Sequence, residues 1–228
     1  YRASERYGGL MDDCAALLAA TADAAETRAF TFRGRSADPF AAPEQLSVAV
    51  AFRRFAGIDL LATVDGAATD RDSLAALAKG QDIRIAEDDS WADIFSRVLV
   101  ERIEPHLGLG RATILDEYPV SQAALAQGTA HDPRVAERFE LYVCGVEVAN
   151  AFGELTDAAE QRRRFETEMA EKERIHGERY PIDEDFLAAL AEMPPASGIA
   201  LGFDRLVMLA TGAPRIEQVL WTPVAEPQ

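Results

Sequence analysis

Two acidic side chains on either side of a two-residue turn are the first place where this sequence could do chemistry. Glu140 and Glu147 flank the dipeptide Cys144-Gly145 within β-rich runs. A glycine-containing dipeptide between two such runs predicts a β-hairpin. If Cys144 and Gly145 form the turn, Tyr142 lies opposite Glu147. Strand alternation then places Glu140, Tyr142 and Glu147 on one face.

The spacing of these two glutamates suits a divalent cation. As diagonal neighbours in the hairpin, Glu140 and Glu147 would have Cα atoms roughly 7–8 Å apart. Two like charges that close repel each other unless a cation lies between them. Carboxylate oxygens suit Mg²⁺, which usually takes one or two of them together with substrate phosphates. The same spacing also fits the solvated outer face of a hairpin, so the spacing leaves both interpretations open.

The register of the second strand decides whether a further polar side chain joins this face. In an unbroken ladder Leu141 faces Val148, and Asn150 points to the opposite face. Asn150 can share the site only if a bulge lies near Ala149 or Ala151.

A third acid follows the same strand. Glu154 comes after the small residues Ala151 and Gly153, which leave room beside the backbone for a ligand. A carboxylate there could hold a substrate ammonium. Alternatively, Glu154 and Asp157 precede a helix, where acids favour the helix dipole. The sequence leaves these two interpretations open.

A glycine-rich strand supplies the second candidate surface. In the stretch 197–209, small residues alternate with apolar ones, and Gly198, Ala200 and Gly202 leave one face almost without side chains. A flat ring could lie against such a backbone. Arg205 stands at the start of the following helix, where its guanidinium and the helix dipole both favour phosphate. The alternative is close packing of strand and helix with a surface arginine. The stretch is neither a Walker loop nor a Rossmann fingerprint.

The elements that must position these residues alternate between helical and β-rich patterns. The sequence predicts helices at 4–28, 44–56, 69–79, 90–107, 157–176 and 204–209, an exposed connection at 29–42, and strands at 112–118, 138–143, 146–152 and 199–203. Strands separated by long helical insertions, with a hairpin among them, indicate an α+β fold whose antiparallel sheet is flanked by helices.

Composition sets the outer limits. The 228 residues suffice for one large domain or two small ones. The net charge of −16 disfavours a protein that grips nucleic acid through phosphates. The triplet Arg162-Arg163-Arg164 could still form a local basic patch, or else an exposed helix face. Cys14 and Cys144 form no ligand or disulfide pattern, which indicates a reducing, cytoplasmic setting. No apolar run approaches the roughly 18 residues of a membrane helix, so no membrane partner is expected.

Together these segments resemble the catalytic domain of class II aminoacyl-tRNA synthetases. The run from Gly198 to Arg205 is similar to the third signature motif of that class, and 139–157 resembles the lysyl-tRNA synthetase branch. The chain resembles more closely the lysyl-tRNA synthetase-like family that modifies elongation factor P. Residues 119–126, 135–139 and 180–183 also match the pattern of that family. Ala200 stands where lysyl-tRNA synthetases usually have glycine.

The resemblance implies roles for individual residues. Those implied for ATP are Glu140, Glu147, Gly198, Gly202 and Arg205, with Mg²⁺ on Glu140 and Glu147. Those implied for the amino acid are Tyr1, Glu147, Asn150, Glu154 and Ala200, with Glu154 pairing with the lysine ammonium. Glu147 and Arg205 are implied as catalytic residues. We therefore expect Glu147, Glu154 and Arg205 to surround one cavity.

The resemblance also implies a reaction. An amino-acid carboxylate, of lysine or (R)-β-lysine, attacks the α-phosphorus of ATP, and a lysine side chain of elongation factor P then attacks the adenylate to give an amide. Residues 1–228 would form one catalytic domain, with motif 1 and most of motif 2 expected upstream of residue 1, and the intact protein would be a homodimer that does not use tRNA. Two alternatives remain: the catalytic domain of a lysyl-tRNA synthetase, and a non-catalytic paralogue that acts as a binding protein.

Overall fold

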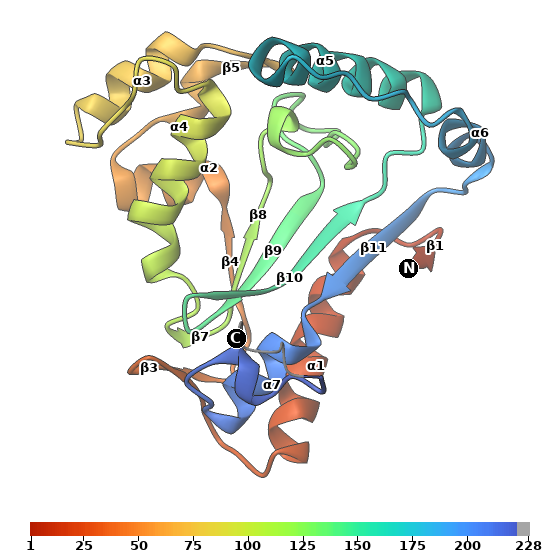
Figure 1. The fold of residues 1–228 in the computed structure, drawn as a ribbon. Coiled ribbons are helices and arrows are strands. Elements are labelled where there is room, and N and C mark those ends of the chain that lie inside the picture. The colour runs from red at the N-terminus through yellow and green to blue at the C-terminus, as the bar shows by residue number, and fades with distance from the viewer. Residues whose placement is uncertain (223–228) are drawn as a thin grey trace, which may run out of the picture.

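The computed structural model describes residues 1–222 and has a six-stranded sheet at its centre (Figure 1). The strands follow the order β1-β11-β10-β9-β8-β4, and all neighbours are antiparallel except β4 and β8. Their bounds are Arg2–Ala3 (β1), Glu44–Ser47 (β4), Thr113–Asp116 (β8), Arg138–Val143 (β9), Val146–Gly153 (β10) and Ala196–Leu201 (β11). The predicted α+β class is confirmed.

Helices surround this sheet. Their bounds are Gly8–Ala24 (α1), Val48–Ala51 (α2), Arg71–Lys79 (α3), Trp91–Val98 (α4), Ala158–His176 (α5), Glu184–Glu192 (α6) and Phe203–Thr211 (α7). Local signals set several of these ends. Ser90 and Asp93 form a complete capping box at α4, Asp157 caps α5, and Gly212 ends α7 with a φ of 67°.

The predicted helix at 44–56 is wrong in its first part. Residues Glu44–Ser47 form β4 at the edge of the sheet, and the helix begins only after Ser47, whose side chain accepts a hydrogen bond from the Val50 backbone N–H. Leu46 is buried and fits the spacing of a helical stripe as well as it fits a strand. The serine is the N-cap signal that separates the two elements.

The predicted exposed connection at 29–42 is also wrong. It contains the strands β2 (Phe30–Phe32) and β3 (Arg35–Asp38), joined by Arg33 and Gly34 with φ of 48° and 78°. β3 pairs with β7 (Gly110–Arg111), and a separate hairpin consists of β5 (Val64–Asp65) and β6 (Ala68–Thr69). Because this stretch contains many turn residues, its sequence did not predict the two short strands. Phe30 of β2 and Ala37 of β3 are buried in the core.

Two smaller differences concern helix boundaries. The helix predicted at 4–28 begins at Gly8, because residues 2–3 form β1 along β11. α6 was not predicted, although Asp183 is a regular N-cap that accepts a hydrogen bond from the Phe186 N–H (2.9 Å). Of its nine residues only Leu187 and Leu190 are buried, so the apolar stripe is too narrow to indicate a helix in the sequence.

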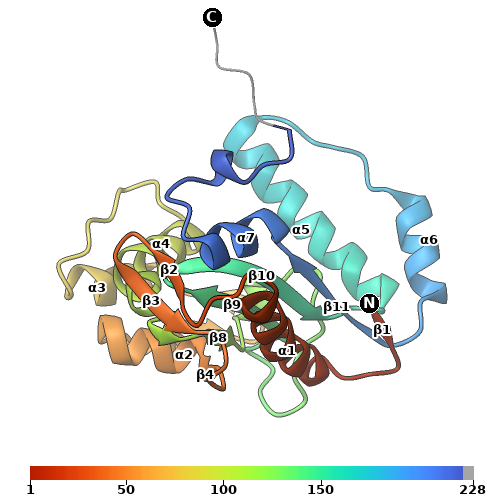
Figure 2. The same cartoon turned by 90° about the horizontal axis from the view of Figure 1, so that it is seen from below.

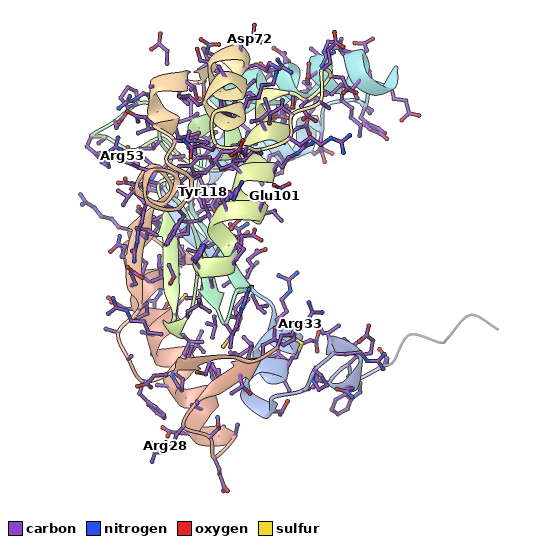
Figure 3. The ribbon with its side chains drawn as sticks, turned by 90° about the vertical axis from the view of Figure 1, so that its left-hand side faces the viewer. Arg28, Arg33, Arg53, Asp72, Glu101 and Tyr118 are labelled. Atoms are coloured by element: carbon purple, nitrogen blue, oxygen red, sulfur yellow. The ribbon has the colours of Figure 1, made fainter. Side chains whose placement is uncertain are left out.

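The sheet separates two hydrophobic clusters. One face, here called the closed face, packs against α1 and α7, which contact each other (Figure 2). It carries Phe139, Leu141, Val143, Ala149 and Ala151. The other face is covered over β4, β8 and part of β9 by a cluster from α2, α3 and α4. Figure 3 places Tyr118 inside that cluster, while Arg53, Asp72 and Glu101 lie at the surface.

Direct partners in adjacent strands share a face. The side of β9, β10 and β11 that is turned away from α1 and α7 is here called the site face, and its residues follow from the observed register: Glu140, Tyr142, Glu147, Asn150, Phe152, Gly198 and Ala200.

Candidate functional site

The turn of the β9–β10 hairpin lies at the predicted dipeptide. Cys144 and Gly145 have φ of 54° and 74°, as tight two-residue hairpin turns require. Tyr142 pairs with Glu147, as predicted. Glu147 and Tyr142 therefore point to the same side of the sheet.

A bulge changes the register of the rest of β10. Leu141 pairs with Ala149, so the predicted pair of Leu141 and Val148 is wrong, and Val148 is the extra residue. After the bulge, Asn150 pairs with Glu140 and lies on the site face. The condition that the sequence set for Asn150, a bulge near Ala149, is met.

Glu140 lies beneath the site face and is only 6% exposed. Its Oε2 accepts hydrogen bonds from the hydroxyls of Tyr118 (2.6 Å) and Tyr142 (2.7 Å), and its Oε1 accepts one from Arg138 Nη2 (2.6 Å). The Arg138 guanidinium also lies 4.3 Å from the centre of the Tyr118 ring. Both carboxylate oxygens thus have protein partners, and these hydrogen bonds connect Glu140 to side chains of β9 and to Tyr118 below the site. Its role toward Mg²⁺ and ATP stays a prediction.

Glu147 and Arg205 line one cavity of about 490 Å³ near the hairpin turn. Arg205 Nη1 donates to the Glu147 carbonyl oxygen (2.8 Å) and lies 3.6 Å from Glu147 Oε2. The Gly202 N–H donates to the Val148 carbonyl oxygen (2.8 Å), which fixes the start of α7 against the bulge. The glycine strand and the hairpin therefore meet at the predicted arginine.

This cavity contains a second carboxylate, Glu104, that sequence analysis missed. Glu104 lies in the short 3₁₀ turn Glu104–His106, and its Oε1 accepts a hydrogen bond from the Tyr142 hydroxyl (3.3 Å). Burial raises the pKa of Glu104, and the bond from Tyr142 partly offsets this. Burial also raises the pKa of Glu147, the nearby charge of Glu140 raises it further, and Arg205 opposes both effects. No spacing in the sequence connects Glu104 with the hairpin.

Carboxylates that are half buried and close together favour a bound cation. Within residues 1–222, however, no group of three or more His, Cys, Asp or Glu side chains is arranged to hold a metal ion. A divalent cation beside Glu147 would therefore need ligands from outside the protein, such as phosphate oxygens.

Glu154 is not among the residues that line this cavity, and the expectation of one cavity around Glu147, Glu154 and Arg205 stays a prediction. Glu154 lies just beyond β10, beside Gly198 and Tyr1. A Cβ atom on Gly198 would collide with Glu154 Oε1 and lie 2.7 Å from Tyr1 Cε1. The absence of a side chain at Gly198 lets the Glu154 carboxylate and the Tyr1 ring lie close against the backbone of β11. Burial raises the pKa of Glu154.

Two further predicted residues lie between these groups. Asn150 pairs with Ala200 across β10 and β11, and both lie on the site face. Asn150 Oδ1 is buried and has no hydrogen-bond partner among the described residues, whereas Ala200 is exposed. The predicted residues thus form two groups on one sheet face: Glu147, Gly202 and Arg205 at the hairpin turn, and Tyr1, Glu154 and Gly198 at the other end of β10.

The arginine triplet in α5 does not present three unpaired charges. Arg162 pairs with Glu184 of α6, and Arg163 pairs with Glu160. Arg164 is bound to Glu160 and to backbone carbonyls. These ion pairs favour the alternative of an exposed helix face over that of a local basic patch.

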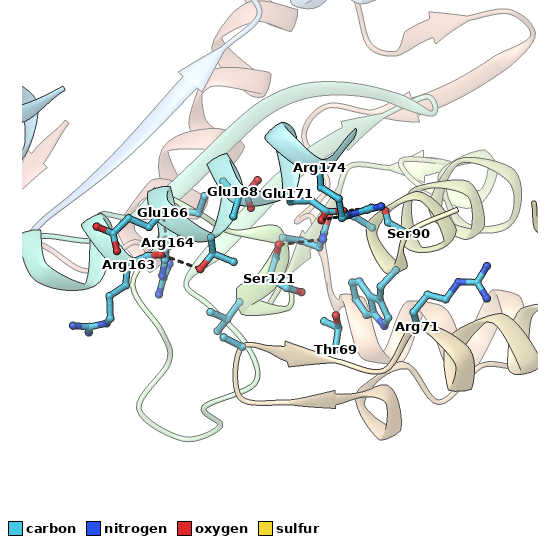
Figure 4. A pocket seen from close by; sticks show the side chains of 18 of the residues that line it. Thr69, Arg71, Ser90, Ser121, Arg163, Arg164, Glu166, Glu168, Glu171 and Arg174 are labelled. Atoms are coloured by element: carbon cyan, nitrogen blue, oxygen red, sulfur yellow. Dashed lines mark hydrogen bonds and ion pairs between the residues drawn. The ribbon is translucent and has the colours of Figure 1, made fainter. Parts of the chain in front are cut away.

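A larger cleft, of about 1310 Å³, lies elsewhere, between α5, the start of α4 and the segment 120–124. Figure 4 shows Arg163, Arg164 and Glu168 of α5 above Thr69 and Ser121. None of the predicted site residues lines it. Several of its charged side chains, including Arg163, Arg164 and Arg174, belong to ion pairs, so size alone does not make it the reactive site.

In the part of the chain that the structure describes, no helix has the length and apolar character needed to cross a membrane.

Comparisons with known proteins agree with this geometry. The family model for class II tRNA synthetases (D, K and N) matches residues 100–226. The chain is 46% identical over 186 residues to an elongation factor P–(R)-β-lysine ligase of Proteus mirabilis, covering 80% of this chain and 55% of the relative. It is 43% identical over 180 residues to the protein of that name in Edwardsiella ictaluri, covering 78% and 54%. The chain thus spans about half the length of the curated relatives it matches. The resemblance that the motifs indicated is confirmed.

Proposed function

This chain belongs to the class II tRNA synthetases (D, K and N), and from that premise we propose that it is part of an ATP-dependent amino-acid ligase. The ligase activates lysine or (R)-β-lysine as an adenylate and transfers it to a lysine side chain of elongation factor P. The names of the relatives support this choice of amino acid and acceptor.

The observation that carries the proposal is the close approach of the Glu154 carboxylate and the Tyr1 ring to the backbone of Gly198. A half-buried carboxylate beside a residue without a side chain can accept a ligand ammonium without displacing the backbone. Burial disfavours the charged form of the carboxylate because water no longer solvates it. A bound cation would give the carboxylate a favourable charge–charge interaction in place of that solvation. In this proposal Glu154 pairs with the side-chain ammonium of lysine or β-lysine, and Tyr1, Asn150 and Ala200 border the amino acid.

The second group of residues fits a nucleotide phosphate. Arg205 lies in the first turn of α7, which begins at Phe203, and it lines the cavity together with Glu147. A guanidinium at a helix N-terminus favours phosphate because charge and helix dipole act together. We assign the phosphates of ATP to this end of the site face, with Gly198 and Gly202 leaving room for the rest of the nucleotide.

The acids of this cavity also fit a magnesium ion. Glu147 and Glu104 are half buried, and their pKa values are raised by burial and by the Glu140 charge, a situation that a bound cation would relieve. Glu140 has both oxygens engaged by Tyr118, Tyr142 and Arg138. In this proposal Glu147 holds Mg²⁺ together with phosphate oxygens, Glu104 is a further ligand, and Glu140 orients the site from below. The ion would neutralise phosphate charge.

The remaining chemistry consists mainly of positioning. The amino-acid carboxylate is already ionised near neutral pH, so its attack on the α-phosphorus of ATP needs no general base. Arg205 stabilises charge on the phosphates while pyrophosphate leaves. Glu154 and Asn150 hold the amino acid so that its carboxylate points toward the turn end of β10. The acceptor amine then attacks the adenylate carbonyl, and AMP leaves.

Mass spectrometry of elongation factor P tests the proposal. After incubation of the full-length protein with ATP, Mg²⁺ and either lysine isomer, elongation factor P should gain the mass of one lysyl group on a lysine side chain. The same reaction without ATP is the control. If tRNA is charged and elongation factor P is unchanged, the protein is a lysyl-tRNA synthetase, the alternative that the family description favours. If neither acceptor is modified and no pyrophosphate is released, it is a non-catalytic paralogue.

Other properties follow from the same proposal. The paired charges of Arg162, Arg163 and Arg164 and the net charge of −16 support a protein acceptor over tRNA. Cys14 and Cys144 are buried free thiols, which supports a cytoplasmic location. A homodimer is proposed for the full-length protein from its family alone.

A further inference from the structure

The segment 123–127 runs beside the acid that we assign to the substrate ammonium. Ala126 forms an isolated antiparallel bridge with Glu154. The Leu155 N–H donates to the Leu125 carbonyl oxygen (2.9 Å), and the Gln127 N–H donates to the Gly153 carbonyl oxygen (2.8 Å). The backbone on both sides of Glu154 is therefore bonded to this one segment.

The segment has no regular strand structure of its own, so its position depends on what holds its other side. At one end of the segment the Gln127 carbonyl oxygen accepts a hydrogen bond from the Glu137 N–H (2.9 Å), and α5 supports the rest. Arg164 Nη1 donates to the carbonyl oxygens of Ala126 (2.8 Å), Ala123 (2.9 Å) and Ala124 (3.4 Å). Gln161, one turn earlier on the helix, donates from Nε2 to the Ala124 carbonyl oxygen (3.1 Å).

These contacts set Arg164 apart from its neighbours. The Arg164 side chain is 14% exposed, against 64% for that of Arg163, and Gln161 is 1% exposed. Arg164 Nε is fixed by Glu160 Oε1 (2.9 Å), which leaves Nη1 directed at the segment. A planar guanidinium can hold a carboxylate and several carbonyls at once, which the single ammonium of lysine cannot do in the same geometry. In Figure 4 Arg164 lies close to the segment that carries Ser121.

A closed loop of contacts results. Glu154 leads directly to Asp157, the N-cap of α5, and α5 returns through Arg164 to the segment that binds the backbone of Glu154. We propose that Arg164, assisted by Gln161, is a positioning residue that sets the place of the Glu154 carboxylate and so the affinity of the site for its amino acid. This inference rests on the proposed function, because it assigns the ammonium of the substrate to Glu154.

Steady-state pyrophosphate exchange with the full-length protein tests the inference. Arg164→Lys keeps the charge and removes the contacts to several carbonyls, and Arg164→Met removes both. We expect the KM for the amino acid to rise about tenfold for Arg164→Lys and more for Arg164→Met, because catalytic groups must be held to within about 0.5 Å. The KM for ATP should stay within about twofold, because Arg205 and Glu147 belong to the other end of β10.

Arg163→Met is the matched control, since it removes the same charge from the adjacent position, and within residues 1–222 the one side-chain partner of Arg163 is Glu160. It should leave both KM values unchanged. Hydrogen exchange of the Leu155 and Gln127 amides provides a second measurement, and both should exchange faster in the Arg164 variants than in Arg163→Met.

Two results would overturn the inference. One is an amino-acid KM in both Arg164 variants that equals that of Arg163→Met. The other is a parallel change in the amino-acid KM, the ATP KM and the unfolding temperature, which would make Arg164 a stabilising residue only. If the wild-type protein itself shows no lysine-dependent exchange, the proposed function fails, and this outcome is distinct because it is seen before any substitution.

Discussion

The two faces of the central sheet are made by the same strands and differ in what their side chains contact. On the closed face, Phe139, Leu141 and Ala151 are at most 1% exposed and pack against α1 and α7. On the site face, Asn150 has an unpartnered buried oxygen among the described residues, and Gly198 has no side chain. Alternation along a strand allows one face to stabilise the fold while the other remains free for binding.

The site face also contains charges that a purely structural surface would avoid. The Glu140 charge raises the pKa values of Glu104 and Glu147, and burial raises the pKa of Glu154, which forms no ion pair among the described residues. Such groups lower stability in the free protein and gain partners when a ligand binds. The comparison therefore predicts that substitutions on the closed face affect unfolding, and that substitutions on the site face affect substrates.

The largest expected effect is on the closed face. Phe139→Ala should lower the free energy of unfolding by about 3–5 kcal/mol, because it removes a fully buried ring from a packed core. Urea unfolding measures this value. Phe203→Ala is the control: its side chain is 69% exposed, and the change should stay within about 0.5 kcal/mol. Equal losses in the two variants would contradict the division between the faces.

On the site face, Glu154→Gln should abolish the opposite-charge contact with the substrate ammonium. We expect lysine-dependent pyrophosphate exchange to fall about thirtyfold or more, because loss of one partner of a buried charge pair costs about 2–5 kcal/mol. The unfolding free energy should be unchanged or higher. The control is Glu192→Gln, an exposed acid at the end of α6, which should leave exchange unchanged. Wild-type exchange in Glu154→Gln would remove Glu154 from the pocket.

A smaller steric effect is expected at Gly198. Gly198→Ala places a Cβ atom against Glu154 Oε1 and 2.7 Å from Tyr1 Cε1, so one of these side chains must move. The amino-acid KM should rise about tenfold, since a displacement near 1 Å can cost up to about 10²-fold in rate or binding. Gly128→Ala, where the nearest atom is 4.0 Å away, is the matched control and should behave as wild type. A normal KM in Gly198→Ala would indicate that the amino acid binds elsewhere.

The mildest test uses pH. Because burial raises the Glu154 pKa, the folded protein holds this proton more tightly than the unfolded chain does. Between the ordinary and the raised pKa, increasing pH should therefore lower the stability of the wild type relative to Glu154→Gln. Over the same range, lysine should bind the wild type more tightly, because the carboxylate becomes charged. Unfolding curves and titration calorimetry at several pH values measure the two trends, and trends of the same sign would exclude Glu154 as their source.

Sequence reasoning succeeded where one local pattern determines the structure. The dipeptide Cys144-Gly145 was sufficient to predict the hairpin, and Ser90 with Asp93 was sufficient for the start of α4. It failed where a short segment owes its conformation to distant partners. β4 is a strand because it pairs with β8 about 70 residues later, and four residues carry too little periodicity to reveal that.

The candidate site shows the same division. The predicted site residues lie on one sheet face or at its edge, because alternation and motif order determine which side chains can meet. Glu104 was missed because it reaches the cavity from the turn after α4, through a contact with Tyr142 that only the folded chain creates. Spacing predicted the separation of Glu140 and Glu147, but it could not predict the hydrogen bonds that Glu140 accepts from Tyr118 and Tyr142.

The extra residue at Val148 divides β10 into two half-strands. The face to which side chains point is determined separately in each half. The half before it carries Glu147 and faces Arg205, and the half after it carries Asn150 and leads to Glu154. Substitutions in the half after Val148 therefore do not change the face to which Glu147 points. Under the proposed function, a substitution in the half that leads to Glu154 would alter amino-acid binding without moving Glu147 away from Arg205.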